Sequence, residues 1–329
     1  MLLAKQTSDA SGNFRFDDPG AGPFYVVQYK PGSPDVAGTT RNTLYQQPKP
    51  ADKFPLTVSA NGRFLQQADG QPFFLHADYP SSIAVQCTHA QIDTYLNDRQ
   101  VRGFNGILFA ALEHLYSGQT PAWRNIQSAA DPFTAMTDFA TPNAAYWQTI
   151  DYIVNSAKAR GMVCLIDPAY LGFSGTEEGW DTEVSAESDA DLQGYGVFLA
   201  KRYKQGNVIW CVGGDRGGDS TLINKQWQIV NGIRSERTAD LITGHPARTA
   251  SDAYSVWGGF SGFSLNSIYT ANDASDVYSE AATAYARALP YIFFEGSSDD
   301  GASDAVVRRQ MIGAILSGAC GHVLLVYPL

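Results

Sequence analysis

The sequence predicts an α/β protein, specifically a (β/α)8 TIM barrel with a short N-terminal β-hairpin extension. From residue 54 onward, eight short apolar segments with strand character are separated mostly by segments with helical spacing. This alternation favours parallel strands joined by right-handed crossovers, and eight strands are the number at which such a sheet closes into a barrel. A doubly wound open sheet is the competing fold, but no glycine-rich dinucleotide-binding motif follows the first strand.

The eight expected strands are short apolar runs, and a hairpin at 64–75 leads into the first, which ends near Asp78. The others span 104–110, 162–166, 207–214, 241–244, 265–269, 291–295 and 322–327. The expected helices span 91–101, 143–160, 189–203, 224–234, 275–289 and 305–316. The clearest is 143–160, which carries an amphipathic apolar stripe and is followed by Gly161, a typical helix-ending residue. The chain stops at Leu329, directly after the eighth strand, so we expect the last outer helix to be missing.

The first fifty residues differ from the rest in composition. A turn at 11–13, the segment 14–16 and the alternating run 24–29 predict a hairpin among glycine- and proline-rich residues. We therefore divide the chain into a partial β-module with a linker, residues 1–50, and a barrel domain, residues 51–329. A hairpin of this size is not stable alone, and through it the N-terminus could attach to other β-modules.

The composition narrows the classes of partner. A net charge of −10 and a pI of about 4.9 disfavour nucleic acid, whose phosphates an acidic surface repels, whereas neutral sugars meet no such penalty. No stretch approaches the roughly 20 apolar residues that cross a bilayer. No signal peptide is visible in Met1–Ala10, and the compartment stays open between secreted, surface and virion-associated. The four cysteines have no motif spacing, so neither a zinc site nor a disulfide framework is indicated.

Polar residues at the strand ends are the candidates for chemistry, because the active site of such a barrel lies at the carboxyl ends of its strands. They are Asp78, Glu113, Asp167, Asp215, His245, Tyr269 and Glu295. No Gly-x-Ser-x-Gly nucleophile motif exists. The glycine-rich run 213–219 lacks the lysine of a phosphate-binding loop. We expect neither a cofactor nor a metal ion.

Asp215 and Glu295 are the expected catalytic pair. Glycoside hydrolysis needs one carboxyl group that protonates the leaving oxygen and a second that attacks or activates water. Asp215 follows two glycines that let the backbone turn sharply, and Glu295 closes four apolar residues, where an acid is costly unless it faces a polar cavity. Taken singly, each acid could equally pair with an arginine or cap a helix.

The other strand-end residues are expected to bind substrate. Asp78, Glu113, Asp167, His245 and Tyr269 could contact sugar hydroxyls or tune the catalytic pair, with a structural hydrogen bond as the equal alternative. Tyr170, Trp180 and Trp257 could be stacking platforms for sugar rings, with core packing as the alternative.

An ordered set of segments resembles one enzyme family. It includes Asn61–Leu65, Asp69–Leu75, Gly103–Asn105, Asn207–Asp215, Phe294–Gly296 and Gly321–His322. From about residue 54 to the C-terminus the chain resembles the apiosidase-like glycoside hydrolases, glycoside hydrolase family 140 and its relatives. The resemblance implies a retaining barrel in which Asp215 is the acid/base and Glu295 the nucleophile. It also implies release of apiose-containing units from pectin or related plant glycosides. One departure is Asp78-Tyr79-Pro80, where the family usually has Asp-Thr and a nearby Trp.

The sequence therefore predicts a retaining glycosidase with a carbohydrate substrate. The runner-up is a non-catalytic carbohydrate-binding barrel in a surface or phage-tail assembly. An inverting hydrolase would use the same residues but needs a wider gap, above about 6.5 Å rather than near 5 Å between the two carboxyl groups.

Overall fold

The computed structural model describes residues 27–28, 38–39, 53–173, 176–217, 220–248, 250, 252–270, 276–297 and 303–324. The chain divides into two units, residues 1–52 and 53–329. In the first unit, β1 (Val27–Gln28) pairs antiparallel with β2 (Gly38–Thr39). The rest of the expected N-terminal hairpin lies outside the described residues.

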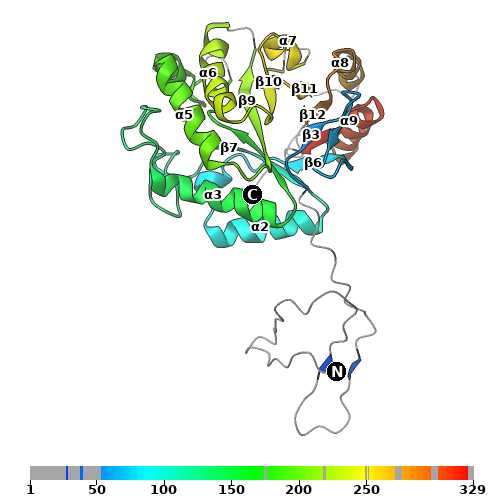
Figure 1. Ribbon diagram of the computed structural model, residues 1–329, viewed down its shortest axis with the longest axis horizontal. Coiled ribbons are helices and arrows are strands. Elements are labelled where there is room, and N and C mark those ends of the chain that lie inside the picture. The colour runs from blue at the N-terminus through cyan, green and yellow to red at the C-terminus, as the bar shows by residue number, and fades with distance from the viewer. Residues whose placement is uncertain are drawn as a thin grey trace. The chain divides into compact units, whose positions relative to one another are not determined.

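The second unit is built on eight strands, and helices surround them in Figure 1. The strands are β6 (Leu75–Asp78), β7 (Gly106–Ala110), β8 (Val163–Asp167), β9 (Val208–Arg216), β10 (Leu241–Pro246), β11 (Asn266–Tyr269), β12 (Tyr291–Glu295) and β13 (Gly321–Leu324). Their order in the sheet is β10-β9-β8-β7-β6-β13-β12-β11, and every neighbouring pair is parallel.

Hydrogen bonds also join the two strands at the ends of this order, β10 and β11. The Leu265 N–H donates to the carbonyl oxygen of Ile242 at 3.0 Å, and the Ser267 hydroxyl donates to the carbonyl oxygen of Gly244. The sheet therefore curls into a nearly closed barrel, and the predicted TIM-barrel fold is confirmed.

Helices follow most strands, as the spacing of apolar residues predicts. They are α1 (Ile83–Gln86), α2 (His89–Val101), α3 (Ala144–Ala159), α4 (Asp181–Ala186), α5 (Asp189–Arg202), α6 (Ser220–Glu236), α7 (Tyr254–Trp257), α8 (Asp276–Tyr285) and α9 (Asp304–Leu316). Local chemistry fixes several starts: Thr88 and Gln91 form a capping box on α2, and Asn143 caps α3. The six predicted helices are confirmed, whereas the short α1, α4 and α7 were not predicted. No helix among the described residues has the length and apolar character needed to span a bilayer.

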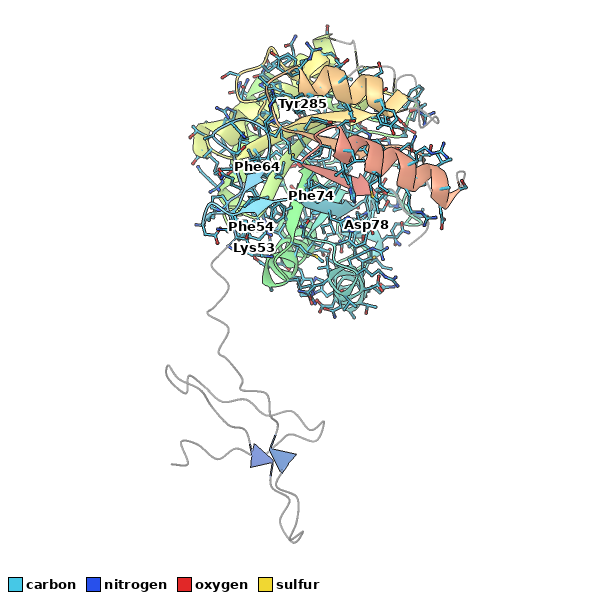
Figure 2. The ribbon with its side chains drawn as sticks, turned by 90° about the vertical axis from the view of Figure 1, so that its right-hand side faces the viewer. Lys53, Phe54, Phe64, Phe74, Asp78 and Tyr285 are labelled. Atoms are coloured by element: carbon cyan, nitrogen blue, oxygen red, sulfur yellow. The ribbon has the colours of Figure 1, made fainter. Side chains whose placement is uncertain are left out.

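A small antiparallel sheet packs against the amino-terminal end of the barrel. It consists of β3 (Thr57–Val58), β4 (Leu65–Gln66) and β5 (Pro72–Phe73), and β5 leads directly into β6. Its apolar residues join one cluster with the barrel interior: Phe54, Leu56, Leu65, Phe73, Leu75, Ile209, Cys211 and Ile292. In Figure 2 the labelled Phe54 and Phe64 lie on the side where β6 begins, and Asp78 lies toward the other end. With this end packed, a site can open only at the carboxyl ends of the strands.

Candidate active site

A cavity of about 640 Å³ opens at the carboxyl ends of the strands. Asp215, at the end of β9, and Glu295, at the end of β12, both line it together with His245 of β10. The other lining residues come from the end of β7 and from the segments after β6, β7 and β8: Tyr79, Pro80, Ser81, Ser82, Gln86, Cys87, Gln91, Thr94, Tyr95, Ala110, Leu112, Glu113, Tyr116 and Tyr170. Two acids 80 positions apart in the chain thus face one space.

The two carboxylates converge on His245. Its Nε2 lies 3.0 Å from Glu295 Oε2 and 3.7 Å from Asp215 Oδ1. One oxygen of Asp215, one of Glu295 and the imidazole nitrogen all lie within 4.8 Å of one another. Among the described residues, no lysine or arginine forms an ion pair with either acid. His245 is therefore the described basic residue that faces the two carboxylates, and neither of them is held by a lysine or arginine.

The backbone around Asp215 explains why the sequence needs two glycines there. Gly213, Gly214 and Asp215 have φ values of 107°, 98° and 55°. A Cβ on Gly213 would lie 2.4 Å from the carbonyl oxygen of His245, and one on Gly214 would lie 2.5 Å from the Tyr170 ring. The two glycines therefore make room for other parts of the protein, the His245 backbone and the Tyr170 ring. Asp215 itself adopts a left-handed conformation that is rare outside glycine, and such strain clusters at functional sites.

The pKa values in the cavity move in directions that suit proton transfer. Burial raises the pKa of Asp215, and the nearby Glu295 carboxylate raises it further, while His245 and a 3.2 Å hydrogen bond from the Tyr170 hydroxyl oppose the rise. Burial alone would lower the pKa of His245, but the carboxylates of Asp215 and Glu295 hold it above the usual value. A carboxyl group whose pKa is raised beside a second carboxylate is the arrangement expected of a general acid.

Glu113 and Asp167, two further acids predicted at the strand ends, differ in their surroundings. Glu113 lines the cavity, and its Oε1 accepts three backbone hydrogen bonds, from His114 at 2.9 Å, Leu115 at 3.1 Å and Tyr116 at 2.9 Å. It therefore shapes the loop after β7. Asp167 is buried, accepts a 3.0 Å hydrogen bond from the Ala169 N–H, and has its pKa raised by burial to about 8.

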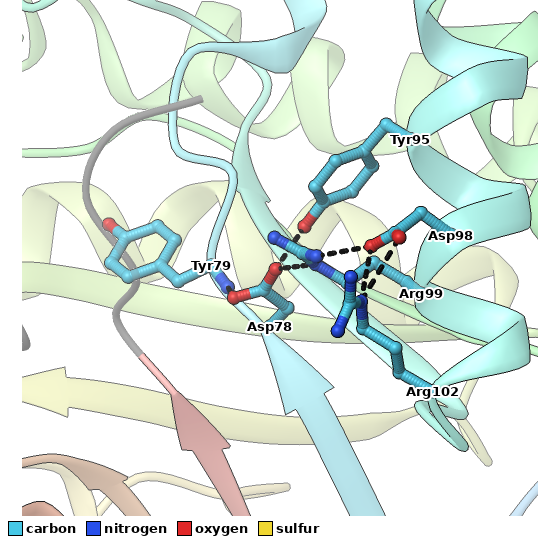
Figure 3. A network of polar contacts seen from close by, with 6 residues as sticks. All are labelled: Asp78, Tyr79, Tyr95, Asp98, Arg99 and Arg102. Atoms are coloured by element: carbon cyan, nitrogen blue, oxygen red, sulfur yellow. Dashed lines mark hydrogen bonds and ion pairs between the residues drawn. The ribbon is translucent and has the colours of Figure 1, made fainter. Parts of the chain in front are cut away.

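Asp78 is not among the residues that line the cavity, and Figure 3 shows its carboxylate facing Tyr95 and Arg99 of α2. Its Oδ2 accepts a 2.5 Å hydrogen bond from the Tyr95 hydroxyl and forms an ion pair with Arg99, while its Oδ1 accepts a 2.9 Å hydrogen bond from the Tyr79 N–H. This position does not favour the predicted contact of Asp78 with sugar and agrees with the alternative, a structural hydrogen bond. Asp78 instead joins β6 to α2 and holds the backbone of Tyr79.

The two tryptophans predicted as stacking platforms lie in the core. Trp180 is 1% exposed and packs against Phe133 and Phe139, and Trp257 is 0% exposed. A buried indole offers no face to a sugar, so the core-packing alternative describes both. Tyr170 does line the cavity, and Tyr269 is buried with its ring 5.6 Å from that of His245.

Several lining residues were not predicted from the sequence. Tyr79 follows β6 and packs edge-on to His245 with ring centroids 6.2 Å apart, and Tyr116, 50% exposed, lies after β7. Tyr79 had a signal, since it stands in the segment that departs from the family pattern. Tyr116 had none, because a tyrosine in a long loop looks the same whether it faces a cavity or the core.

Asp215, His245 and Glu295 are also the described residues whose donor atoms could together hold a metal ion. An ion there would occupy both carboxylates. The same three side chains could therefore take part in acid/base chemistry or hold a metal ion. The effect of a chelator on activity distinguishes the two.

Comparisons with known proteins concern the family and the fold. The model of the family "Apiosidase-like, catalytic domain" matches residues 59–324. Among solved structures, a glycoside hydrolase has a TM-score of 0.67 and 21% identity over 83% of this chain and 65% of its own. A glycoside hydrolase family 5 protein from Bacteroides vulgatus has a TM-score of 0.67 and 23% identity, over 82% of this chain and 62% of its own.

A third neighbour is an endo-1,4-β-mannanase from Rhizomucor miehei, with a TM-score of 0.59 and 11% identity over 82% of this chain and 89% of its own. Of the first two structures, by contrast, this chain spans only 65% and 62% of the length. The comparison with curated proteins gave no match. At these identities the solved structures show the shared fold, and the family model covers most of the barrel unit. The chain therefore belongs to the apiosidase-like catalytic-domain family.

Proposed function

We propose that this protein is a retaining glycosidase in which Asp215 is the acid/base and Glu295 the nucleophile. One observation carries the proposal: the two carboxylates, from β9 and β12, approach within 4.8 Å of each other in one open cavity. Retaining enzymes hold their carboxyl groups about 5–5.5 Å apart, whereas inverting enzymes leave about 6.5–9.5 Å for a water molecule. The observed approach supports direct attack on the sugar.

In the first step, Asp215 would donate its proton to the oxygen of the leaving group while Glu295 attacks the anomeric carbon. The glycosidic C–O bond breaks, and an ester forms between the sugar and Glu295. Asp215, now a carboxylate, would then take a proton from water as the water attacks that ester and releases Glu295. The raised pKa of Asp215 supports this role because the residue must start protonated.

His245 and Tyr170 would position the pair. His245 contacts both carboxylates, so in its protonated form it would hold Glu295 ionised while restraining the side chain of Asp215. The Tyr170 hydroxyl donates a hydrogen bond to Asp215 Oδ2 at 3.2 Å. That bond is strongest when Asp215 is ionised, which is its state between the two steps.

The proposed substrate is a plant-type polysaccharide or a pectin-derived glycoside. Membership of the apiosidase-like family supports this class, and so does the lining of the cavity, which combines tyrosine rings with hydroxyl and amide groups. Aromatic rings stack on the apolar faces of sugars, and hydroxyls and amides pair with sugar hydroxyls.

Two variants test the assignment on a panel of aryl glycosides and plant oligosaccharides. Glu295→Gln should lose turnover on every substrate by at least about 10³-fold, because no nucleophile remains. Asp215→Asn should lose turnover on natural glycosides but form the glycosyl-enzyme from aryl glycosides whose leaving group needs no proton. Glu236→Gln, at an exposed ion pair with Lys201, is the matched control and should leave turnover unchanged.

The results of these experiments distinguish the proposed glycosidase from the alternative functions. Wild-type turnover in both cavity variants would contradict the proposal. Glycan binding without turnover by the wild-type protein would favour a non-catalytic carbohydrate-binding barrel. Proton NMR of the first product should show the anomer of the substrate, whereas the opposite anomer would indicate inversion. Activity should survive treatment with EDTA, and its loss would assign the three side chains to a metal ion.

A further inference from the structure

A buried glutamine lies on the helix that follows each carboxylate-bearing strand. Gln226, on α6, is 1% exposed, and Gln310, on α9, is 0% exposed. α6 follows β9, the strand of Asp215, and α9 follows β12, the strand of Glu295. Burying a side-chain amide costs free energy unless its donor and its acceptor are both paired. The partners of these two amides therefore indicate what the amides do.

Gln226 joins the ends of β9 and β8. Its Oε1 accepts a 2.9 Å hydrogen bond from the Gly213 N–H, and its Nε2 donates to the carbonyl oxygens of Ala169 at 3.0 Å and Gly213 at 3.4 Å. Regular pairing of the two strands ends earlier, at Ile166 and Trp210. The amide therefore helps to hold the two strand ends together beyond the point where the regular pairing stops.

The two backbone segments that Gln226 joins carry Asp215 and its hydrogen-bond partner. The backbone from Gly213 to Asp215 has φ values of 107°, 98° and 55°. Tyr170 directly follows Ala169, and its hydroxyl donates to Asp215 Oδ2 at 3.2 Å. Left-handed backbone of this kind persists only where the surrounding contacts fix it. Because Gln226 supplies such contacts, it sets the direction of Asp215 and its spacing from Tyr170.

Gln310 joins the ends of β12 and β11 in the same way. Its Oε1 accepts a 2.9 Å hydrogen bond from the Ser297 N–H, and its Nε2 donates to Thr270 Oγ1 at 3.2 Å. The Thr270 N–H in turn donates to the carbonyl oxygen of Glu295 at 3.0 Å. A Cβ on Gly296 would lie 2.7 Å from the amide oxygen of Gln310, so the backbone after Glu295 packs directly against this amide.

We infer that Gln226 and Gln310 are a matched pair of positioning residues, one for the proton donor and one for the nucleophile. Neither glutamine is among the residues that line the cavity, so each acts through the backbone that carries its carboxylate. The inference rests on the proposed function, because it divides the glutamines between the roles of Asp215 and Glu295. A displacement of about 1 Å at a reacting group can cost about 10²-fold in rate.

Replacement of each glutamine by methionine tests this division, because methionine fills a similar space but lacks the amide. The substrates are the phenyl and 2,4-dinitrophenyl glycosides of the panel sugar that the wild-type protein hydrolyses. Departure of phenol needs the proton of Asp215, whereas dinitrophenolate leaves without one. Sodium azide is the second probe. It attacks the anomeric carbon of the glycosyl-enzyme without a general base, forms a glycosyl azide and releases Glu295 as a carboxylate.

The two variants should differ in their dependence on the leaving group. In Gln226→Met, kcat/KM should fall about 10²-fold for the phenyl glycoside but less than about threefold for the dinitrophenyl glycoside. Its kcat for the dinitrophenyl glycoside should also fall, because attack by water needs Asp215 as a base, and azide should restore it. In Gln310→Met, kcat/KM should fall about 10²-fold for both glycosides without rescue by azide, because every substrate needs the nucleophile.

Controls separate positioning from a purely structural role. Both methionine variants should unfold at a lower temperature than the wild-type protein by a similar amount, since each leaves a backbone N–H without its partner. A structural role alone would therefore not separate them. Gln228→Met is the matched control on α6, because Gln228 bonds to Gln193 and to the carbonyl oxygen of Asn224, and it should leave both rates unchanged.

A glutamate at either position keeps the acceptor for the backbone N–H and changes the donor. Gln226→Glu and Gln310→Glu should therefore show the same two patterns at smaller size, and they replace a methionine variant that does not fold. Equal losses on the two glycosides in both variants, or no effect of azide on the Gln226 variant, would overturn the inference and leave the glycosidase intact. A wild-type protein that hydrolyses no glycoside would instead refute the proposed function, and the catalytic part of the inference with it.

Discussion

Asp167 is a buried acid whose replacement should stabilise the protein. It ends β8, is 3% exposed, and has its pKa raised by burial from 3.8 to about 8. At neutral pH it is therefore an uncharged carboxylic acid in the folded protein. Asp167→Asn keeps this shape, and its amide oxygen can still accept the 3.0 Å hydrogen bond from the Ala169 N–H.

The magnitude follows from the two pKa values. Between 3.8 and about 8 the unfolded chain has released a proton that the folded protein keeps, so the free energy of unfolding falls as pH rises. Each pKa unit corresponds to about 1.4 kcal/mol, which over this window gives a ceiling of about 6 kcal/mol. Because asparagine does not titrate, the free energy of unfolding of the variant does not fall in this way as pH rises. We expect a gain of about 2–5 kcal/mol at the upper end of the window and almost none at the lower end.

Urea denaturation across this pH window measures the difference between variant and wild type. Asp304→Asn is the control, because Asp304 is 83% exposed and its substitution should change the free energy of unfolding only slightly. A difference for Asp167→Asn that stays flat with pH, or a variant less stable than wild type at the upper end, would refute the assignment of Asp167 as a neutral buried acid.

Two further predictions concern the residues around the cavity. Arg99→Gln should lower the free energy of unfolding by about 3 kcal/mol, since it breaks an ion pair with an Asp78 side chain that is 3% exposed; Arg102→Gln, 64% exposed, should change it by less than about 0.5 kcal/mol. Thermal unfolding of both variants checks this, and equal losses would contradict it. Tyr170→Phe removes a hydrogen bond that opposes the effect of burial on the pKa of Asp215, so the basic limb of the profile of kcat/KM against pH should move to higher pH. An unchanged limb would show that Asp215 is not the group that titrates there.

The barrel could be predicted from the sequence because its signals are local and repeated. The apolar stripe of α3 and the four consecutive apolar residues of β8 that precede Asp167 indicate buried segments from residue type alone. The short α7 carries no such signal, since four residues complete barely one helical turn. The expected hairpin at 14–29 lies mostly outside the described residues and stays a prediction.

The candidate site was predictable only in part. Asp215 and Glu295 end apolar strands, and barrel topology brings strand ends together, so their convergence follows from the fold. The direction of a side chain does not follow from its place in the sequence. Asp78 also ends a strand, yet its carboxylate forms an ion pair with Arg99 of α2. Whether Trp180 lies in the core or faces a sugar likewise depends on its packing against residues far away in the chain, such as Phe133, and a single sequence does not reveal such contacts.

The central claim is that Glu295 forms a covalent bond with the sugar. Incubation with a 2-deoxy-2-fluoro glycoside that carries a good leaving group slows the second step more than the first, and mass spectrometry of the peptides then locates the adduct. We predict one sugar per protein, attached to the peptide that contains Glu295, and none in Glu295→Gln. A sugar attached to another residue, or full turnover of this reagent without any adduct, would contradict the account.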